Sequence, residues 1–222
     1  IAMKLIVISD IHGSMPFVEA VLDEVEKADH VVIAGDISGR GDNRQAESII
    51  SVIEKRNSSI IAVHGNWDDG NVIAMLTERG YSVHGDGRII DGVGFFGVGG
   101  SGPTPMNTPT EYDEETIAGL LTSGYAKVAG CATKVLITHA PPRGLRDRTF
   151  LLVRGGSISV RSFIDQSDVQ VCICGHIHEA RGIEKHEKVT VVNPGSLKSG
   201  KYAHVALNGI PDITLHRIKK EK

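Results

Sequence analysis

Residues 4–76 repeat one arrangement three times: a short apolar run, a polar loop and an amphipathic segment. The apolar runs Lys4–Ser9, His30–Ala34 and Ser59–Val63 are rich in β-branched residues, which is typical of buried strands. Apolar residues then recur at helical spacing, and Ser14 is placed to cap the first helix. They are Phe17, Val18, Val21, Leu22 and Val25, then Ala46, Ile49, Ile50 and Ile53, then Val72, Ile73 and Leu76. Strands that alternate with helices predict a mainly parallel sheet with right-handed crossovers.

The pattern changes after residue 80. Short runs at Tyr81–His84, Arg88–Asp91 and Val93–Val98, separated by Gly and Asp, predict antiparallel hairpins at a sheet edge. The remaining elements predicted are a loop over Gly99–Pro109, helices over Glu111–Lys127 and near Ser159–Gln166, and strands over Lys134–Thr138, Val169–Cys174, Lys188–Val192, Tyr202–Leu207 and Asp212–Ile218. The last three complete a second group of strands. Because no linker or internal repeat interrupts the chain, we expect one α/β domain over residues 1–222 with two packed sheets.

Composition excludes several classes of protein. The hydrophobic fraction of 41% and the charged fraction of 23% are ordinary for a globular chain, and the net charge of −3 gives no attraction to nucleic acid or to an anionic membrane. The longest early apolar run, Leu5–Ile8, is too short to span a membrane. Three cysteines without framework spacing indicate a reducing compartment. We therefore expect a cytoplasmic protein without a membrane partner.

Side chains that can bind metal follow five of the predicted strands. They are Asp10 and His12, Asp36, Asn66, His139, and His176 and His178. Each motif alone is compatible with a turn, a cap or a packing residue. Together they place carboxylate, amide and imidazole groups at the ends of strands, where α/β sheets bind ligands. The set is large enough to hold two borderline divalent ions.

The same motifs carry a family resemblance. Asp-x-His, Gly-Asp, Gly-Asn-x-Asp, a strand-terminal His and Gly-His-x-His occur in this order from Asp10 to His178. The series resembles the calcineurin-like metallophosphoesterase superfamily. His-Ala-Pro-Pro at 139–142 and Asn-Pro-Gly-Ser at 193–196 are similar to its small bacterial and archaeal phosphoesterases. The resemblance implies a four-layer αββα sandwich of two mixed β-sheets flanked by helices.

The resemblance also implies how two divalent ions are held. Each ion would take three side chains of its own and share one carboxylate. The implied sets are Asp10, His12 and His178 for one ion and Asn66, His139 and His176 for the other, with Asp36 and a water bridging them. The implied ions are Mn, Fe, Ni or Zn, with Mn favoured. A bridging hydroxide would attack phosphorus in line with the leaving oxygen, and Asp36 and Asn66 would act catalytically through the metals.

One position departs from the family pattern. Many members have His after the motif Asn, and that His protonates the leaving group, whereas this chain has Trp67. An indole N–H donates a hydrogen bond but does not titrate, and general acid catalysis contributes about 10²–10⁴-fold. Either the substrate has a good leaving group or another residue, such as the nearby His64 or Asp68, donates the proton. Trp67 could instead stack on the substrate, and Arg143 could bind its phosphate.

The sequence therefore predicts a dinuclear-metal phosphoesterase that hydrolyses a phosphodiester or an activated phosphomonoester. Its partner would be a small phosphorylated substrate, with a nucleotide-like compound as one candidate. The alternative is a non-catalytic or weakly active protein-interaction scaffold on the same fold, to which Trp67 gives some weight. A nuclease is disfavoured because no basic stripe interleaved with aromatics occurs. A homo-oligomer that pairs strand edges near Tyr81–Val98 stays open.

Overall fold

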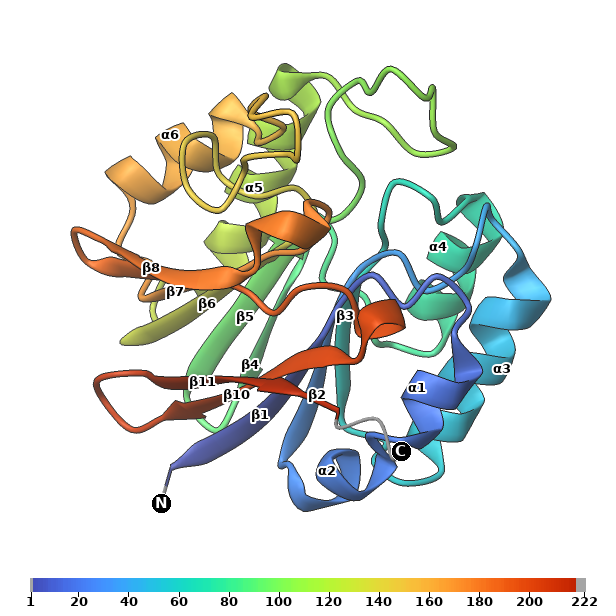
Figure 1. Cartoon of the computed structure of the whole chain (residues 1–222). Helices are drawn as coiled ribbons and strands as arrows, with labels where there is room; N and C mark the ends of the chain where they lie inside the picture. The colour runs from blue at the N-terminus through green and yellow to red at the C-terminus, as the bar shows by residue number, and fades with distance from the viewer. Residues whose placement is uncertain (1, 219–222) are drawn as a thin grey trace.

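Two mixed β-sheets lie face to face, and helices cover the outer face of each sheet (Figure 1). This computed structural model describes residues 2–218. The sheets have five and six strands, so the predicted four-layer αββα sandwich is confirmed. Among residues 2–218, no helix is both long enough and apolar enough to cross a bilayer.

The first sheet is built on the three strands of the repeated arrangement. β1 (Met3–Ile8), β2 (His30–Ala34) and β3 (Ile60–Val63) run parallel, as predicted. The outer face of this sheet carries α1 (Met15–Glu19), α2 (Leu22–Lys27), α3 (Asn43–Glu54) and α4 (Gly70–Glu78) (Figure 1). On α3 the predicted apolar stripe Ala46, Ile49, Ile50 and Ile53 is fully buried.

The first crossover corrects one prediction. The single helix expected after Ser14 is instead α1 and α2, and the Ser14 side chain makes no capping hydrogen bond. The chain tightens between the two helices, where Val21 N–H donates to Val18 C=O and Glu24 N–H donates to Val21 C=O. These bonds span three residues rather than the four of an α-helix. The tighter turn keeps Val18, Val21 and Val25 on the buried face.

The last two strands correct a second prediction. β10 (Lys201–Leu207) and β11 (Asp212–Arg217) were expected in the second group of strands, but they extend the first sheet. β10 pairs antiparallel with β1, and β11 pairs antiparallel with β10. The reason is packing, because alternate β10 residues such as Ala203 and Val205 lie in the core between the sheets.

The second sheet has the order β4-β5-β6-β7-β9-β8. Its strands are β4 (Gly87–Ile90), β5 (Val93–Val98), β6 (Thr133–Thr138), β7 (Val171–Ile173), β8 (Gly182–His186) and β9 (Val189–Asn193). β4 and β5 form the predicted edge hairpin, and β5, β6, β7 and β9 run parallel. Tyr81–His84 forms only isolated bridges, and β8 was not predicted. α5 (Glu114–Val128) and α6 (Ile158–Gln166) cover the outer face.

The inner faces of the two sheets share one apolar core. Val7, Val32 and Val63 of the first sheet pack with Val135 and Ile137 of the second, and all five side chains are fully buried. This packing aligns the carboxyl ends of β1, β2 and β3 with those of β6 and β7. Two short 3₁₀-helices, η1 (His178–Ala180) and η2 (Leu197–Ser199), lie at this end of the sandwich (Figure 1).

Candidate metal centre

The structure brings all seven predicted ligand residues to one end of the two sheets. They are Asp10 and His12 after β1, Asp36 after β2, Asn66 after β3, His139 after β6, and His176 and His178 after β7. The hydrogen bond between His139 Nδ1 and Ala34 C=O, at 2.7 Å, joins the ends of β6 and β2 and so connects the two sheets. The sequence therefore predicted which strand ends meet.

Several of these residues have an unusual backbone conformation. Asp10, His12, Asp36 and His176 have positive φ values of 52°, 45°, 53° and 65°. This left-handed region is uncommon for residues other than glycine, and such residues cluster at functional sites. Each lies just after a buried strand, where the sharp change in direction turns its side chain toward the common site.

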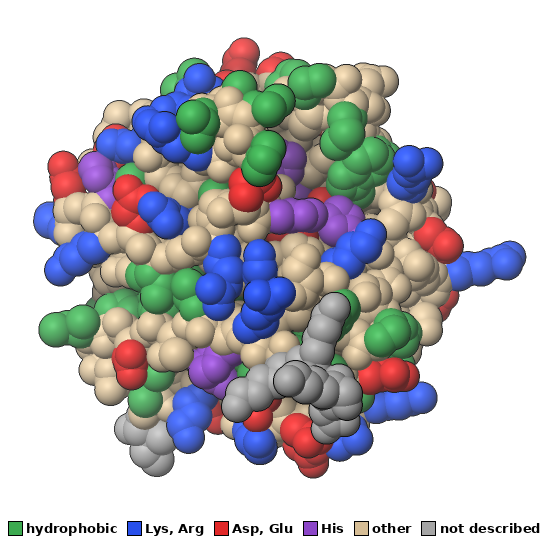
Figure 2. Space-filling view, viewed as in Figure 1, with side chains coloured by type: hydrophobic (Ala, Val, Ile, Leu, Met, Phe, Trp, Pro, Cys, Tyr) green, Lys and Arg blue, Asp and Glu red, His purple; other side chains and the backbone are tan. Residues whose placement is uncertain are grey.

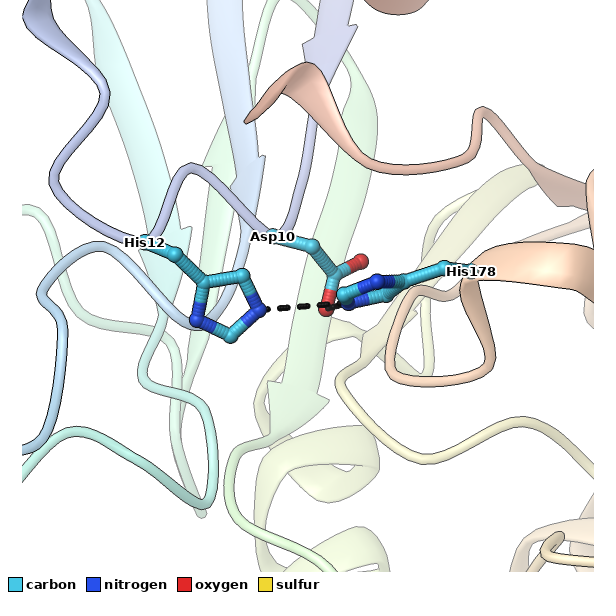
Figure 3. A group of neighbouring side chains, drawn as sticks. All are labelled: Asp10, His12 and His178. Atoms are coloured by element: carbon cyan, nitrogen blue, oxygen red, sulfur yellow. Dashed lines mark hydrogen bonds and ion pairs between the residues drawn. The ribbon is translucent and has the colours of Figure 1, made fainter. Parts of the chain in front are cut away.

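Asp10, His12 and His178 form the first cluster, and their side chains point toward one another (Figure 3). His178 Nε2 lies 3.3 Å from Asp10 Oδ1 and 3.2 Å from His12 Nε2. The Asp10 carboxylate is fully buried and also accepts from the His176 backbone N–H at 3.1 Å. His178 is 42% exposed, so this cluster opens to solvent on the His178 side.

Asn66, His139 and His176 form the second cluster. Asn66 Oδ1 lies 2.9 Å from both His139 Nε2 and His176 Nδ1. Because the Ala34 carbonyl can only accept, His139 Nδ1 carries a proton there, and Nε2 is the ring nitrogen that faces the site and would bind a metal ion after losing its own proton. This is the arrangement of a metal-binding histidine whose second nitrogen is held by a neighbouring oxygen.

Asp36 lies between the two clusters. Its Oδ2 is 3.6 Å from His12 Nε2 and 3.4 Å from His139 Nε2, while its Oδ1 accepts from the Trp67 backbone N–H at 2.9 Å. The carboxylate is 2% exposed, so its orientation is fixed by its neighbours. Asp36 is therefore within reach of one imidazole from each cluster.

The pKa values suit the binding of a cation. Burial raises the pKa of Asp10, but the hydrogen bond from His178 and the nearby His139 outweigh this effect and hold the pKa below its usual range. Burial lowers the pKa of His176 to about 4, so this imidazole is neutral at pH 7. Burial also lowers the pKa of His139, yet Asp36 outweighs it and raises the value to about 9. The field of the two carboxylates thus favours positive charge in the site.

The donor set fits divalent metal ions. His12 and His178 face each other with ring nitrogens 3.2 Å apart, and carboxylate oxygens lie within 3.3–3.6 Å of these nitrogens. Two overlapping groups of acidic and imidazole side chains have ligand atoms close enough to share an ion, and Asp10 belongs to both: Asp10, His12 and His178, and Asp10, Asp36 and His139. Mixed nitrogen and oxygen donors gathered in this way suit divalent metal ions.

Asp68 is a residue of this region whose role the sequence did not reveal. Its fully buried carboxylate accepts from the backbone N–H groups of Gly65, Ile37 and Ser38 at 2.8–3.1 Å, and from the Ser38 hydroxyl at 3.0 Å. Burial and the nearby Asp36 raise the pKa of Asp68, while these donors oppose that rise. Asp68 thus fastens the loop after β2 to the loop after β3 and does not face the substrate side.

His64 is likewise turned away from the solvent side of the site. It is 1% exposed, and its Nε2 lies 3.3 Å from the Tyr112 hydroxyl in a cluster with His84. Burial lowers the pKa of His64 well below its ordinary value. Neither His64 nor Asp68 is therefore placed to protonate a leaving group.

The two predicted substrate contacts have different positions. Trp67 is half-buried and adjoins the site through its backbone bond to Asp36. Arg143 is exposed, and within residues 2–218 no hydrogen bond or ion pair joins its guanidinium to the metal-site residues. Substrate binding by either side chain stays a prediction.

A four-layer α/β sandwich with acidic, amide and imidazole groups at its strand ends defines a class of metal-binding phosphoester hydrolases. Residues 3–208 match the calcineurin-like phosphoesterase superfamily domain, and the chain belongs to this family. The resemblance predicted from the motifs is thus confirmed.

Individual relatives extend this result. The chain is 35% identical over 202 residues to the uncharacterized protein MJ1162 of Methanocaldococcus jannaschii, covering 86% of this chain and 88% of that protein. The crystal structure of TT1561 of Thermus thermophilus is similar with a TM-score of 0.76, 14% identity and coverage of 99% and 100%. A dimetal phosphatase from Danio rerio gives a TM-score of 0.67, 12% identity and coverage of 98% and 99%. At these identities the two structures support the fold.

The buried Asp68 carboxylate generates a stability prediction. Asp68→Ala leaves three backbone N–H groups and a hydroxyl without their acceptor, and each buried unpaired donor costs about 1–3 kcal/mol. We expect the free energy of unfolding to fall by more than about 3 kcal/mol, measured by urea denaturation. The control is Asp69→Ala, which removes the N-cap of α4 and should cost about 1 kcal/mol. Equal losses in the two variants would contradict the role of Asp68.

Proposed function

We propose that this protein is a dinuclear-metal phosphoesterase that hydrolyses a phosphodiester or an activated phosphomonoester. The observation that carries the proposal is the position of Asp36 within 3.4–3.6 Å of one histidine from each of two donor clusters. Such a shared carboxylate suits two neighbouring cations, the arrangement used in phosphoryl transfer. Membership of the phosphoesterase family supports the same reaction class.

The ligand sets of the proposal follow the two clusters. Asp10, His12 and His178 would hold one ion, Asn66, His139 and His176 the other, and Asp36 both. Bound divalent ions would supply an activated water and offset negative charge on the phosphoryl oxygens. Mn²⁺ is favoured over Fe²⁺, Ni²⁺ and Zn²⁺, because carboxylate and amide oxygens make up three of the seven donors and Mn²⁺ accepts such oxygens readily.

The exposure of the ligands sets the direction from which a substrate approaches. His178 and His12 are 42% and 14% exposed, whereas Asp36 and His139 are almost fully buried. A small phosphorylated substrate, nucleotide-like or otherwise, would therefore enter on the His178 side. Because His64 and Asp68 are buried, neither replaces the general acid that Trp67 does not supply, which favours substrates whose leaving group departs without a proton.

The remaining parts of the proposal concern the whole chain. We treat residues 1–222 as a single domain, since the two sheets share one core.

The three cysteines are buried and free, which supports the cytoplasm as the compartment. Strand β4 ends the second sheet and is the edge through which a second copy could pair. The alternative function is a protein-interaction scaffold with little or no activity, and it is tested together with the enzyme.

The test is hydrolysis of bis(4-nitrophenyl) phosphate with added Mn²⁺. We expect turnover by the wild type, and we expect Asp36→Asn to lower both metal content and rate by more than about tenfold, because the neutral amide weakens the shared ligand. Metal content is measured by elemental analysis and turnover by release of nitrophenolate. Asp23→Asn, an exposed carboxylate on α2, is the matched control.

Two outcomes would contradict these assignments. If the wild type bound metal but hydrolysed nothing with Mn²⁺, Ni²⁺, Fe²⁺ or Zn²⁺, the scaffold would be the better interpretation. If Asp36→Asn kept the metal content and rate of the wild type, the shared-ligand role of Asp36 would be wrong.

Trp67→His tests whether the position of the general acid is vacant. An imidazole there could protonate a leaving oxygen, so we expect at least about a tenfold gain in kcat on phenyl phosphate, below the full range of about 10²–10⁴-fold. The gain should be smaller on 4-nitrophenyl phosphate, whose leaving group needs no proton. Trp67→Phe, which removes the indole without adding an acid, is the control. A gain of equal size on both esters would contradict the idea that the general-acid position is vacant in the wild type.

A further inference from the structure

A polar cavity of about 410 Å³ lies beside the chain that follows His178. Residues 144–154 form one side of it and residues 179–184 the other, and four guanidinium groups line it: Arg146, Arg148, Arg154 and Arg181. On the face that carries the histidines, Lys and Arg side chains gather close to them (Figure 2). The four arginines outnumber the three acids of the lining, so the cavity carries an excess of positive charge beside the candidate metal centre of a chain whose net charge is −3.

Two of these arginines are already neutralised. Arg146 Nε lies 2.7 Å from Glu184 Oε2, and Arg154 Nη1 lies 3.2 Å from Asp147 Oδ1. Glu179, the third acid of the lining, accepts from the Phe150 backbone N–H.

The other two arginines remain available for an anion. Within residues 2–218, neither Arg148 nor Arg181 forms an ion pair with an acid. Arg181 donates from Nε to the Pro194 carbonyl at 3.2 Å and from Nη2 to the His216 carbonyl at 3.1 Å. These bonds fix its orientation and leave its positive charge unpaired.

We propose that this cavity binds a second anionic group, a phosphate or a carboxylate, of the phosphoester whose scissile phosphoryl group lies at the metal centre. Guanidinium groups bind such anions through paired hydrogen bonds, and a guanidinium already held in place loses little freedom on binding. The position of the cavity supports this link to the metal centre, because two lining residues, Glu179 and Arg181, lie one and three residues after His178. This inference rests on the proposed function and restricts its substrates to phosphoesters that carry a second anionic group.

The test compares two substrates that differ only in the second anion. They are the 4-nitrophenyl ester of thymidine 5′-phosphate and the same ester with an added 3′-phosphate. For the wild type we expect a higher kcat/KM with the 3′-phosphate. In Arg148→Gln and Arg181→Gln the ratio of the two kcat/KM values should fall at least about tenfold, which corresponds to about 1.4 kcal/mol. Arg56→Gln, which removes a surface cation just after α3, should leave the ratio unchanged.

An unchanged ratio in both cavity variants would overturn the proposal. Calorimetric binding of thymidine 3′,5′-bisphosphate and of thymidine 5′-phosphate separates this failure from that of the proposed function. A wild type that turns over neither ester but binds the bisphosphate more tightly, with the preference lost in the cavity variants, would keep the anion site and reject the enzyme. Equal binding of the two nucleotides would reject the anion site.

A separate chain of hydrogen bonds concerns Asn66. Asn66 Nδ2 donates to Thr108 Oγ1 at 3.0 Å, and Thr108 Oγ1 donates to Glu111 Oε1 at 2.6 Å. The same Glu111 oxygen also accepts from Thr104 Oγ1 at 2.6 Å and from the Thr108 backbone N–H at 2.8 Å. Asn66 and Thr108 are both buried.

The donor and acceptor roles in this series of hydrogen bonds follow from the Glu111 carboxylate. A carboxylate only accepts, so the single hydroxyl proton of Thr108 is used on Glu111 and only lone pairs remain for Asn66. Asn66 must therefore present its NH₂ group to Thr108 and its Oδ1 to His139 and His176, where a metal needs an oxygen. The geometry assigns Thr108 and Glu111 as positioning residues that set the orientation of the Asn66 amide.

Thr108→Val tests this assignment. It keeps the shape of the side chain but removes the lone pairs, so we expect Mn²⁺ affinity, measured by calorimetry, to fall about 10–100-fold. Thr104→Val, which also loses a bond to Glu111 but does not touch Asn66, is the matched control, and Thr108→Ser should restore affinity.

A second measurement does not depend on metal. The Asn66 side-chain amide protons, followed by NMR, should exchange with water faster in Thr108→Val than in Thr104→Val. Equal exchange rates and equal Mn²⁺ affinities in these two variants would overturn the positioning role.

Discussion

The candidate metal centre depends on the packing of two sheets with the carboxyl ends of their parallel strands on the same side. Neither sheet carries all seven candidate ligands: Asp10, His12, Asp36 and Asn66 follow strands of the first sheet, and the histidines at 139, 176 and 178 follow strands of the second. The apolar core between β1–β3 and β5–β7 is therefore what sets the distance between the two groups of ligands. The His139–Ala34 bond adds a polar link across the same boundary and fixes which imidazole nitrogen faces the site.

The loops that follow the strands at this end of the sandwich contain non-glycine residues in unfavourable backbone conformations. Asp10, His12, Asp36 and His176 have positive φ, which costs about 1–3 kcal/mol at each residue. Compensation comes from buried hydrogen bonds. Among them are the four that Asp68 accepts from the loops after β2 and β3. The turn of the backbone at the end of each strand directs a side chain into the site and restricts its movement. The candidate ligands are therefore already oriented for an ion.

Sequence reasoning was most successful where one local signal decided the outcome. β-branched runs located β1, β2 and β3, and the residues that end them located the site. It failed where the partner of an element is distant in sequence. Buried and more exposed residues alternate along β10 and β11 as in any half-buried strand, so the local pattern does not tell which sheet they join. They belong to the first sheet because β10 pairs with β1 and β11 pairs with β10. The function of Asp68 was hidden for a similar reason, since its partners at Ile37 and Ser38 lie about thirty residues away. The break between α1 and α2 reflects packing rather than a helix-breaking residue.

The site separates two demands that a phosphoester hydrolase must meet. The proposed carboxylate, amide and imidazole ligands would offset the charge on the phosphoryl group through the metal ions, but His64 and Asp68 are buried and neither replaces the general acid at the position of Trp67. The rate should then depend steeply on the stability of the leaving group as an anion. Binding energy from the arginine-lined cavity would select among substrates and hold them in place without supplying the missing proton. Selection would therefore rest on two features of the substrate at once: a good leaving group at phosphorus and a second anion at a fixed distance from it.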